Sequence, residues 1–211
     1  GALPMLMSRR DQVQSYAKVL FSLGLIFLGL QTMSGAFKPL RTDADFISLL
    51  QYFDAKSFIS LYGTIFMGCV LTIMVQSSSA MLGITIALAS TGAISFQTAV
   101  ALVLGENIGT TITALLAGIG ANTAARRTAC AHAVFNLLGV GVMSLFFWKY
   151  VDVLEYLIPN NADFFDANGS KPFIAHHIAV GHTLFNVTNV LLFLPFTGYL
   201  ARFVSAIIPE R

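Results

Sequence analysis

The sequence predicts an all-α membrane protein in which full spanning helices flank shorter, broken helices. Of its 211 residues, 56% are hydrophobic and only 10% are charged, whereas a soluble domain is roughly one-quarter charged. Several apolar runs have roughly the 20 residues that a helix needs to cross a bilayer. The surplus of apolar side chains must face an apolar medium. We therefore expect an integral protein of the plasma membrane, which in a bacterium is the inner membrane.

Long and short apolar runs alternate along the chain. Four long runs are expected to form spanning helices: 19–37, 58–75, 129–148 and 178–201. Residues 38–56 mix charges with single hydrophobic residues, which predicts a water-exposed connection with at most a short surface helix. After the second long run the apolar pieces shorten, to 80–89, 96–104 and 112–119. Such half-length pieces separated by polar breaks are typical of ion-coupled transporters near the bilayer midplane.

Three parts are expected along the chain. Residues 1–16 are a cytoplasmic lead-in or inter-repeat linker, 17–205 a transmembrane repeat, and 206–211 a C-terminal tail. The broken-helix and re-entrant region of the repeat lies at about 58–121. Lys and Arg positions place the N-terminus, Arg126, Arg127 and Arg202 in the cytoplasm and the loop 150–175 outside.

The first polar cluster, Gln76, Ser77, Ser78 and Ser79, directly follows a full spanning run. Unsatisfied polar groups at membrane depth are costly, so these side chains need partners or a ligand. An unwound stretch would let their hydroxyl and backbone groups converge on one point. Such a cluster suits a sodium ion, which binds hydroxyl and carbonyl oxygens. It equally suits an oxyanion, which accepts hydrogen bonds from hydroxyl and N–H groups.

The second polar break is Gly105–Thr111. If this segment is helical, Asn107, Thr110 and Thr111 share one face, and Gly109 lets a neighbouring backbone approach closely. The simpler alternative is that Ser, Thr and Gly only allow helices to pack tightly. Two dense polar patches beside half-length helices favour a ligand or ion site over that alternative.

Glu106 is the one acidic residue of the apolar stretches between Phe58 and Trp148. A buried carboxylate must pair, bind a cation or take up a proton. The alternative is a position at a helix end beside water. We expect a contribution of Glu106 to cation coupling.

A short pattern recurs in two of the long helices: His132, Phe135 and Asn136 are repeated as His182, Phe185 and Asn186. His and Asn four residues apart share a helix face. A metal ion needs more ligands than either face supplies. We therefore expect neither a metal site nor a cofactor, but hydrogen bonds between helices that turn polar stripes inward.

Together, Gln76–Ala80 and Gly105–Thr111 resemble the motifs of the type II sodium/phosphate cotransporter family, and the resemblance extends from about Leu23 to Phe196. Members of that family consist of two inverted repeats, each with a re-entrant hairpin that carries a Gln-Ser-Ser-Ser motif. One such motif is present here. The resemblance therefore implies the second repeat, one half of an inverted-repeat transporter, whose partner is a first repeat or a second copy of this chain.

The resemblance also implies a function, the symport of inorganic phosphate with sodium as the coupling ion. It assigns substrate and sodium binding to Gln76, Ser77, Ser78 and Ser79. Supporting roles fall to Asn107, Thr110 and Thr111. Glu106 stands where the human-type sequences have a small residue, a departure that bears on the number of sodium ions and on the pH response.

Other functions are weighed against this one. A passive channel, or a half-transporter subunit that does not transport alone, fits a single repeat without its mate. An intramembrane serine hydrolase would use a serine of the cluster with His132 or His182 as base. It lacks a Gly-x-Ser-x-Gly elbow, so we expect no enzyme activity. The net charge of +2 is spread over several loops, which excludes nucleic acid as an expected partner.

Overall fold

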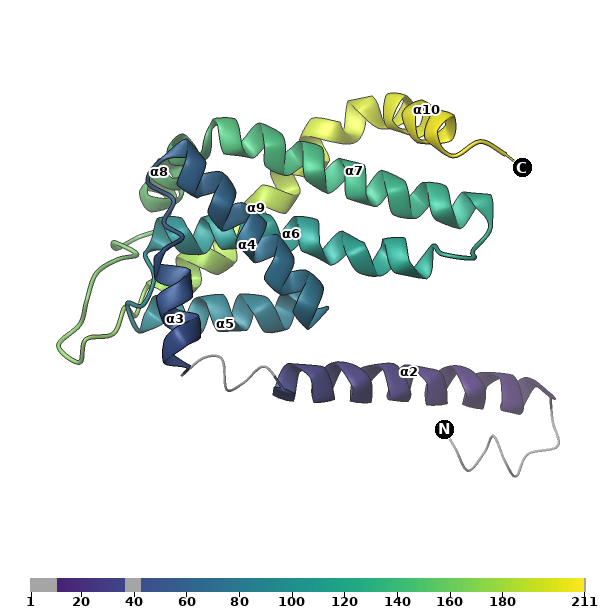
Figure 1. Ribbon diagram of the computed structural model, residues 1–211, viewed down its shortest axis with the longest axis horizontal. Coiled ribbons are helices and arrows are strands. Elements are labelled where there is room, and N and C mark those ends of the chain that lie inside the picture. The colour runs from purple at the N-terminus through teal and green to yellow at the C-terminus, as the bar shows by residue number, and fades with distance from the viewer. Residues whose placement is uncertain (1–10, 37–42, 211) are drawn as a thin grey trace. The chain divides into compact units, whose positions relative to one another are not determined.

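The computed structural model describes residues 11–36 and 43–210. The chain divides into two compact units, Gly1–Pro39 and Leu40–Arg211. Helix α2 (Asp11–Ala36) belongs to the first unit. The second unit contains α3 (Ala44–Gln51), α4 (Phe58–Val75), α5 (Ser78–Ser90), α6 (Phe96–Ala117), α7 (Thr123–Leu145), α8 (Phe147–Leu157), α9 (Ile174–Phe193), the 3-10 turn η2 (Leu194–Phe196) and α10 (Thr197–Ile207) (Figure 1). The described residues contain no strand.

Four stretches of the described chain are long and apolar enough to cross a membrane: Phe58–Val75, Phe96–Ala117, Thr123–Leu145 and Ile174–Ile207. Large apolar side chains remain exposed on them, for example Ile59 (89% exposed), Phe66 (69%) and Leu191 (65%). Such a surface is unfavourable in water and favourable against acyl chains. The predicted all-α membrane protein is confirmed.

The helices near the N-terminus follow the predicted elements, with different bounds. Helix α2 covers the predicted run 19–37 as far as Ala36 and begins earlier, at Asp11. It therefore reaches into the segment 1–16. Phe37 and the start of the predicted connection 38–56 lie outside the described residues. In the rest of that connection, α3 is the short helix that the sequence predicts.

A helical hairpin, α4 followed by α5, carries the first polar cluster. Helix α4 begins with reciprocal caps, in which Ser57 Oγ accepts from the Ser60 N–H (3.3 Å) and Ser60 Oγ accepts from the Ser57 N–H (3.0 Å). It ends at Gln76, whose φ of 51° is left-handed. Ser77 then caps α5 by accepting a hydrogen bond from the Ala80 N–H (3.2 Å). Because only Gln76 and Ser77 separate the two helices, the chain reverses abruptly (Figure 1).

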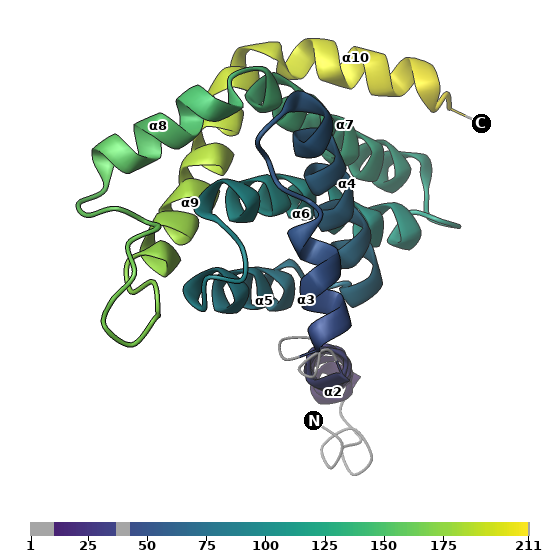
Figure 2. The same ribbon diagram turned by 60° about the vertical axis from the view of Figure 1, so that its left-hand side comes forward.

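Contacts with α6 establish the direction of this hairpin. Gly68 of α4 packs on Leu102 of α6, and one turn further along α4, Thr72 packs on Gly109. Helices α4 and α6 therefore run in the same direction. Helix α5 returns antiparallel to α6, to which a short turn joins it (Figure 2). The hairpin thus starts and ends beside the first residues of α6, as a re-entrant hairpin does when it enters and leaves a membrane on one side.

The loop 158–173 fastens the open end of the hairpin. The Lys171 N–H donates to Ser90 O (2.8 Å), and Lys171 Nζ lies 2.6 Å from Asp163 Oδ1 and 3.3 Å from Ile94 O. The Asp163 carboxylate also accepts from the N–H of Phe96 at the start of α6 (3.1 Å). Lys171 is only 5% exposed. These contacts hold together the end of α5, the start of α6 and the loop.

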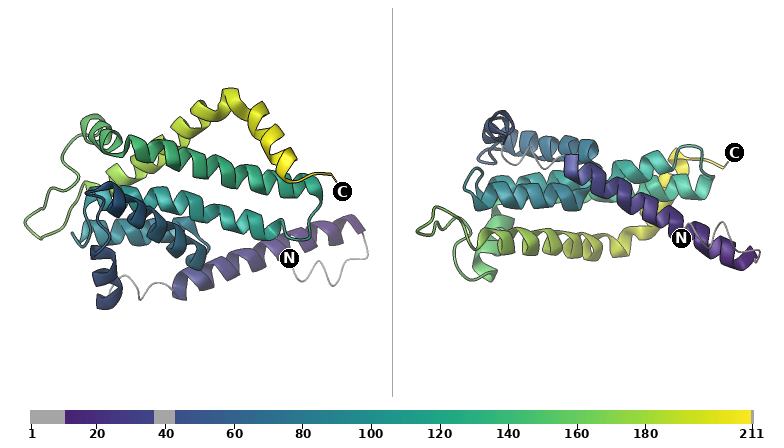
Figure 3. Two further views of the ribbon diagram at one scale, coloured as in Figure 1. Left: turned by 45° about the horizontal axis from the view of Figure 1, so that its top comes forward. Right: turned by 90° about the horizontal axis from the view of Figure 1, so that it is seen from below.

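The opposite end of the unit is closed by the C-terminus. Helix α10 folds back beside the start of α7 (Figure 3). Arg127 Nε donates to Ile208 O (2.9 Å), and the Arg127 guanidinium pairs with Glu210 (3.2 Å). The corner at Gln76 points toward this end of α6, because α4 and α6 are parallel.

Helix α6 corrects one prediction. The sequence predicts separate pieces at 96–104 and 112–119 around a polar break, but α6 is continuous from Phe96 to Ala117. A helix tolerates these polar residues when their side chains donate to its own carbonyl groups, as Thr110 Oγ1 does to Glu106 O (2.7 Å). Of the two predicted breaks, only the one at Gln76–Ser77 is present in the described chain.

The last two long runs differ from prediction at their ends. The predicted helix 178–201 is divided into α9 and α10 by a 3-10 turn, because Pro195 has no N–H to donate. The predicted helix 129–148 begins earlier, at Thr123, and ends at Leu145. Helix α8 then extends to Leu157, so the first part of the predicted loop 150–175 is helical.

Candidate functional site

The corner between α4 and α5 presents four polar side chains together. Gln76 and Ser79 are exposed, and Ser77 and Ser78 are half-buried. The left-handed backbone at Gln76 (φ 51°) costs a residue other than glycine about 1 kcal/mol or more. Glutamine is therefore an unusual residue at a position that favours glycine.

The first turn of α5 offers free hydrogen-bond donors. The first N–H groups of any α-helix lack a partner within the helix, and Ser77 Oγ accepts only from that of Ala80 (3.2 Å). Within the described residues, the backbone N–H and hydroxyl groups of Ser78 and Ser79 make no hydrogen bond. The positive end of the helix dipole lies at the same place. The corner can therefore bind an oxyanion through hydroxyl and amide donors.

The second predicted element lies within α6, where its threonine hydroxyl donors are occupied. Asn107 and Thr111 are buried, and Thr110 is half-buried. The side chain of each donates to a carbonyl three or four residues earlier, at 2.7 to 2.8 Å. These hydrogens are therefore not available to an anion, while the oxygen lone pairs of the same side chains remain free to accept.

Two glycines of this element bring α6 against α4. A Cβ at Gly105 would lie 2.0 Å from Ile65 O, and a Cβ at Gly109 would lie 2.6 Å from Cys69 O. The two glycines are four residues apart, which is the small-xxx-small spacing of close helix pairs in membranes. The close approach predicted for Gly109 is confirmed.

The same register locates the corner beside α6. Thr72 packs on Gly109, and Gln76 follows Thr72 by one turn of α4. The corner therefore lies toward the C-terminal half of α6, in which Thr110 directly follows Gly109.

Asn107 and Thr111 lie on another side of α6. Val100 and Leu104 face Phe185 of α9 across a small cavity. Asn107 and Thr111 follow them at spacings of three and four residues, which keeps side chains on one stripe of a helix. This stripe is directed toward α9. Sequence spacing groups both residues with Thr110, whereas in α6 they continue the stripe that is directed toward α9.

Glu106 lies in the middle of α6 and not at a helix end. Its side chain is directed to α5, where its Oε1 accepts a hydrogen bond from Thr85 Oγ1 (2.7 Å). Glu106 is 3% exposed and Thr85 is fully buried. Among the described residues, no Lys, Arg or His forms an ion pair with Glu106.

Thr85 is absent from the site residues that the sequence predicts. It stands alone as a hydroxyl side chain within the predicted apolar piece 80–89. A single threonine in the middle of a half-length apolar helix is the signal that could have identified it, because a buried hydroxyl requires a partner.

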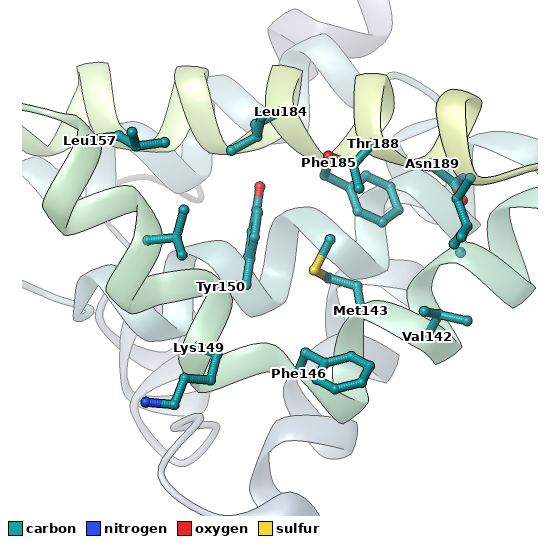
Figure 4. A pocket seen from close by; sticks show the side chains of 13 residues that line it. Val142, Met143, Phe146, Lys149, Tyr150, Leu157, Leu184, Phe185, Thr188 and Asn189 are labelled. Carbon is teal, nitrogen blue, oxygen red and sulfur yellow. The ribbon is translucent and has the colours of Figure 1, made fainter.

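A cavity of about 550 Å³ lies elsewhere, between α7, α8 and α9 (Figure 4). Met143 and Tyr150 extend into it, and apart from Lys149, Tyr150, Thr188 and Asn189 its lining is apolar. None of the predicted site residues lines this cavity. The serine corner is instead an open surface of this chain.

The repeated His-Phe-Asn pattern occupies equivalent turns of α7 and α9. Asn136 Nδ2 donates to His132 O (3.1 Å), and Asn186 Nδ2 donates to His182 O (2.9 Å). The predicted hydrogen bonds between helices are wrong at these residues, because each amide bonds within its own helix. Neither histidine contacts Ser77, Ser78 or Ser79 through a hydrogen bond in the described residues, so the hydrolase hypothesis gains no support.

Known proteins resemble this chain along its whole length. The family model described as Na+/Pi-cotransporter matches residues 45–158. The chain is 33% identical to "Uncharacterized protein YqeW" of Bacillus subtilis, over 100% of this chain and 63% of that protein. It is 29% identical to "Putative inorganic phosphate export protein YjbB" of Escherichia coli, over 100% and 36%. It is 37% identical to "Sodium-dependent phosphate transport protein 2C" of Rattus norvegicus, over 56% and 19%. No solved structure matches.

The chain spans 63% of the length of YqeW and 36% of the length of YjbB. The range matched by the family model includes the α4–α5 hairpin and α6, and so both polar elements that carry the resemblance. The match agrees with the predicted location as an integral protein of the plasma membrane. On this match, the chain belongs to the Na+/Pi-cotransporter family.

Proposed function

We propose that this chain takes part in sodium-coupled transport of inorganic phosphate. The observation that carries the proposal is the serine corner, where free hydroxyl and N–H donors of Ser78 and Ser79 meet the N-terminus of α5. Near neutral pH phosphate is an anion whose unprotonated oxygens accept hydrogen bonds, so it matches a set of donors. The family and the name of the Rattus norvegicus relative support the same substrate.

The corner residues bind both the substrate and the ion, through different atoms. Ser78, Ser79 and the side-chain amide of Gln76 donate hydrogen bonds to phosphate oxygens. Ser77 holds the start of α5 in place through its cap on Ala80 (3.2 Å). The oxygen atoms of the same glutamine and serine side chains bind sodium. Thr110 forms the α6 side of the corner, and Asn107 and Thr111 support α6 through hydrogen bonds within the helix.

Charge balance couples the two fluxes. Neutral donors alone do not offset the cost of taking an anion out of water. Sodium at the corner supplies the missing positive charge, so phosphate binds well only when sodium is bound. The hairpin geometry supports movement of the site, because Asp163 and Lys171 fasten the end of α5 to the start of α6, whereas the other end of α5 is joined to α4 by a two-residue corner.

A partner is required to enclose the substrate. Ser79 and Gln76 are exposed on the surface of this chain, and a desolvated anion needs protein on all sides. A first repeat of the same transporter, or a second copy of this chain, supplies the other wall. Without that partner, this chain would bind phosphate weakly and would not transport it, which is the half-transporter hypothesis.

Phosphate flux in reconstituted vesicles tests the proposal. The wild-type protein should accumulate phosphate above equilibrium under a sodium gradient, and reversing the gradient establishes the preferred direction. Ser78→Ala and Ser79→Ala should each lower the flux at least about tenfold, since a hydrogen bond to a charged group contributes about 1.5 to 3 kcal/mol. Ser48→Ala, an exposed serine of α3, is the control. Flux that only reaches equilibrium, with or without sodium, would establish a channel instead.

A further inference from the structure

The buried pair of Glu106 and Thr85 is not used by the proposed phosphate site. It joins the middle of α6 to the middle of α5, with 2.7 Å between Thr85 Oγ1 and Glu106 Oε1. Glu106 is 3% exposed and Thr85 is fully buried. The pair therefore lies in the contact between the hairpin and α6, the surface that must slide or open if the hairpin moves.

A carboxylate in this position needs a positive partner. An isolated charge inside a membrane protein is costly, and one hydroxyl donor offsets only a small part of the cost. A hard metal cation takes roughly six oxygen ligands, whereas Thr85 is the one side chain that contacts the carboxyl group through a hydrogen bond in the described residues. The Glu106 backbone oxygen already accepts from Thr110 (2.7 Å). A proton needs no further ligand, so it is the cation that fits.

Ionisable groups of the surrounding helices do not supply the positive charge that the Glu106 carboxylate needs. Helix α5 has none. Those of the other helices packed on α6 are Tyr62 and Cys69 on α4, Arg126, Arg127, Cys130 and His132 on α7, and His176, His177 and His182 on α9.

The backbone of Cys69 packs on Gly105. His182, together with Tyr150 of α8, lines a small cavity beside Val103 and Leu104, about one turn before Glu106. None of these three groups forms an ion pair with Glu106. The groups of α7 lie beside the other end of α6, where Ala129 contacts Gly118.

We propose that Glu106 and Thr85 form a proton-binding site that is filled while α5 packs on α6 and empties when the hairpin separates from α6. The proton resides on the carboxyl oxygen that does not accept from Thr85. When the two helices separate, water enters and the O–H bond of the carboxylic acid breaks. The products are a carboxylate and a hydronium ion, and closure of the hairpin takes one proton back.

Infrared difference spectroscopy of the intact protein in lipid tests the site without any transport assay. A step from neutral to alkaline pH should remove the carbonyl band of a buried protonated carboxylic acid, because exposed carboxyl groups are already ionised at neutral pH. This band should be missing in Glu106→Gln. It should remain in Asp152→Asn, which changes an exposed carboxyl of α8 (68% exposed), and in His182→Gln. Thr85→Val should move the band to higher frequency, because the carbonyl loses its hydrogen bond.

Two spectroscopic results would overturn the proposal: a band that persists in Glu106→Gln, or a wild-type protein without the band at any pH. If Glu106→Gln does not fold, the frequency shift in Thr85→Val decides, and an unshifted band overturns the proposal.

The flux arm of the test rests on the proposed phosphate transport. Wild-type flux should change by up to about tenfold per pH unit, the limit for one linked proton. Glu106→Gln should vary less than about twofold over the same range, and Glu106→Asp should restore the dependence. Equal pH dependence in wild type and Glu106→Gln would overturn the coupling. Absence of sodium-driven flux in the wild type would instead contradict the proposed function and leave the infrared result standing.

Discussion

Replacing Gly105 with alanine adds a carbon at the closest contact between α4 and α6. The new Cβ would lie 2.0 Å from the carbonyl oxygen of Ile65, whereas carbon and oxygen atoms in contact are about 3.3 Å apart or more. The oxygen belongs to the backbone, so no change of rotamer relieves the clash. The helices must separate by roughly 1.3 Å, the difference between these two distances. Overpacking of this kind costs about 1 to 3 kcal/mol.

The separation would also move the serine corner, because α4 carries Gln76 at its end. A displacement of about 1 Å in a site can lower a rate by up to about 100-fold. Gly141→Ala in α7 is the matched control, since its Cβ would meet nothing within 4 Å. Both variants are compared with the wild type by thermal unfolding in detergent and by phosphate flux in vesicles. If Gly105→Ala unfolds at the same temperature and transports at the same rate as the wild type, the packing argument is refuted.

Three smaller changes test other contacts. Asp163→Ala leaves Lys171 buried without its partner and should lower the free energy of unfolding by about 2 to 3 kcal/mol. Thermal unfolding measures this change. An effect no larger than that of Asp152→Ala, which alters an exposed residue, would contradict it. Gln76→Gly relaxes a left-handed backbone and should raise the free energy of unfolding by up to about 1 kcal/mol, while phosphate flux falls at least about tenfold. Unchanged flux would exclude a role for the amide. Thr111→Val should change the flux less than about threefold, because its hydroxyl donates within α6; a tenfold loss would place that hydroxyl on the substrate.

The corner at Gln76 was predictable because its signal is local. An apolar run of spanning length, 58–75, stops abruptly at four polar residues and resumes for only about ten residues. Neither a spanning helix nor a surface loop has this pattern, so a short turn inside the membrane is the remaining solution. A left-handed residue at a helix end and a serine before a helix start, as at Gln76 and Ser77, are common caps, although glycine is the usual left-handed residue.

The continuity of α6 was not predictable from composition. Asn107, Thr110 and Thr111 are the same residue types whether a helix breaks at them or continues. The helix continues when each polar side chain donates to a carbonyl group of the same helix, as all three do here. Gly105 and Gly109 do not interrupt α6 but allow α4 to approach, as the sequence predicts for Gly109.

The sequence pattern could not predict contacts between residues that are far apart in the chain. Thr85 and Glu106 are 21 positions apart, and Lys171 meets Ile94 across 77 positions. Each residue is ordinary in its own segment, an isolated threonine in one helix and a lysine in a polar loop. Only the antiparallel return of α5 and the folding of the loop 158–173 over its end bring them together.

Protection of the serine corner from chemical labelling tests the central claim most directly. The protein carries Ala80→Cys, a half-buried residue next to Ser79, in a background where Cys69 and Cys130, both half-buried free thiols, are replaced by alanine. The rate of modification by a polar thiol reagent is measured with phosphate, with sodium and with both. We expect phosphate to slow the modification only when sodium is present. A rate that is the same under all conditions would contradict binding of phosphate at this corner.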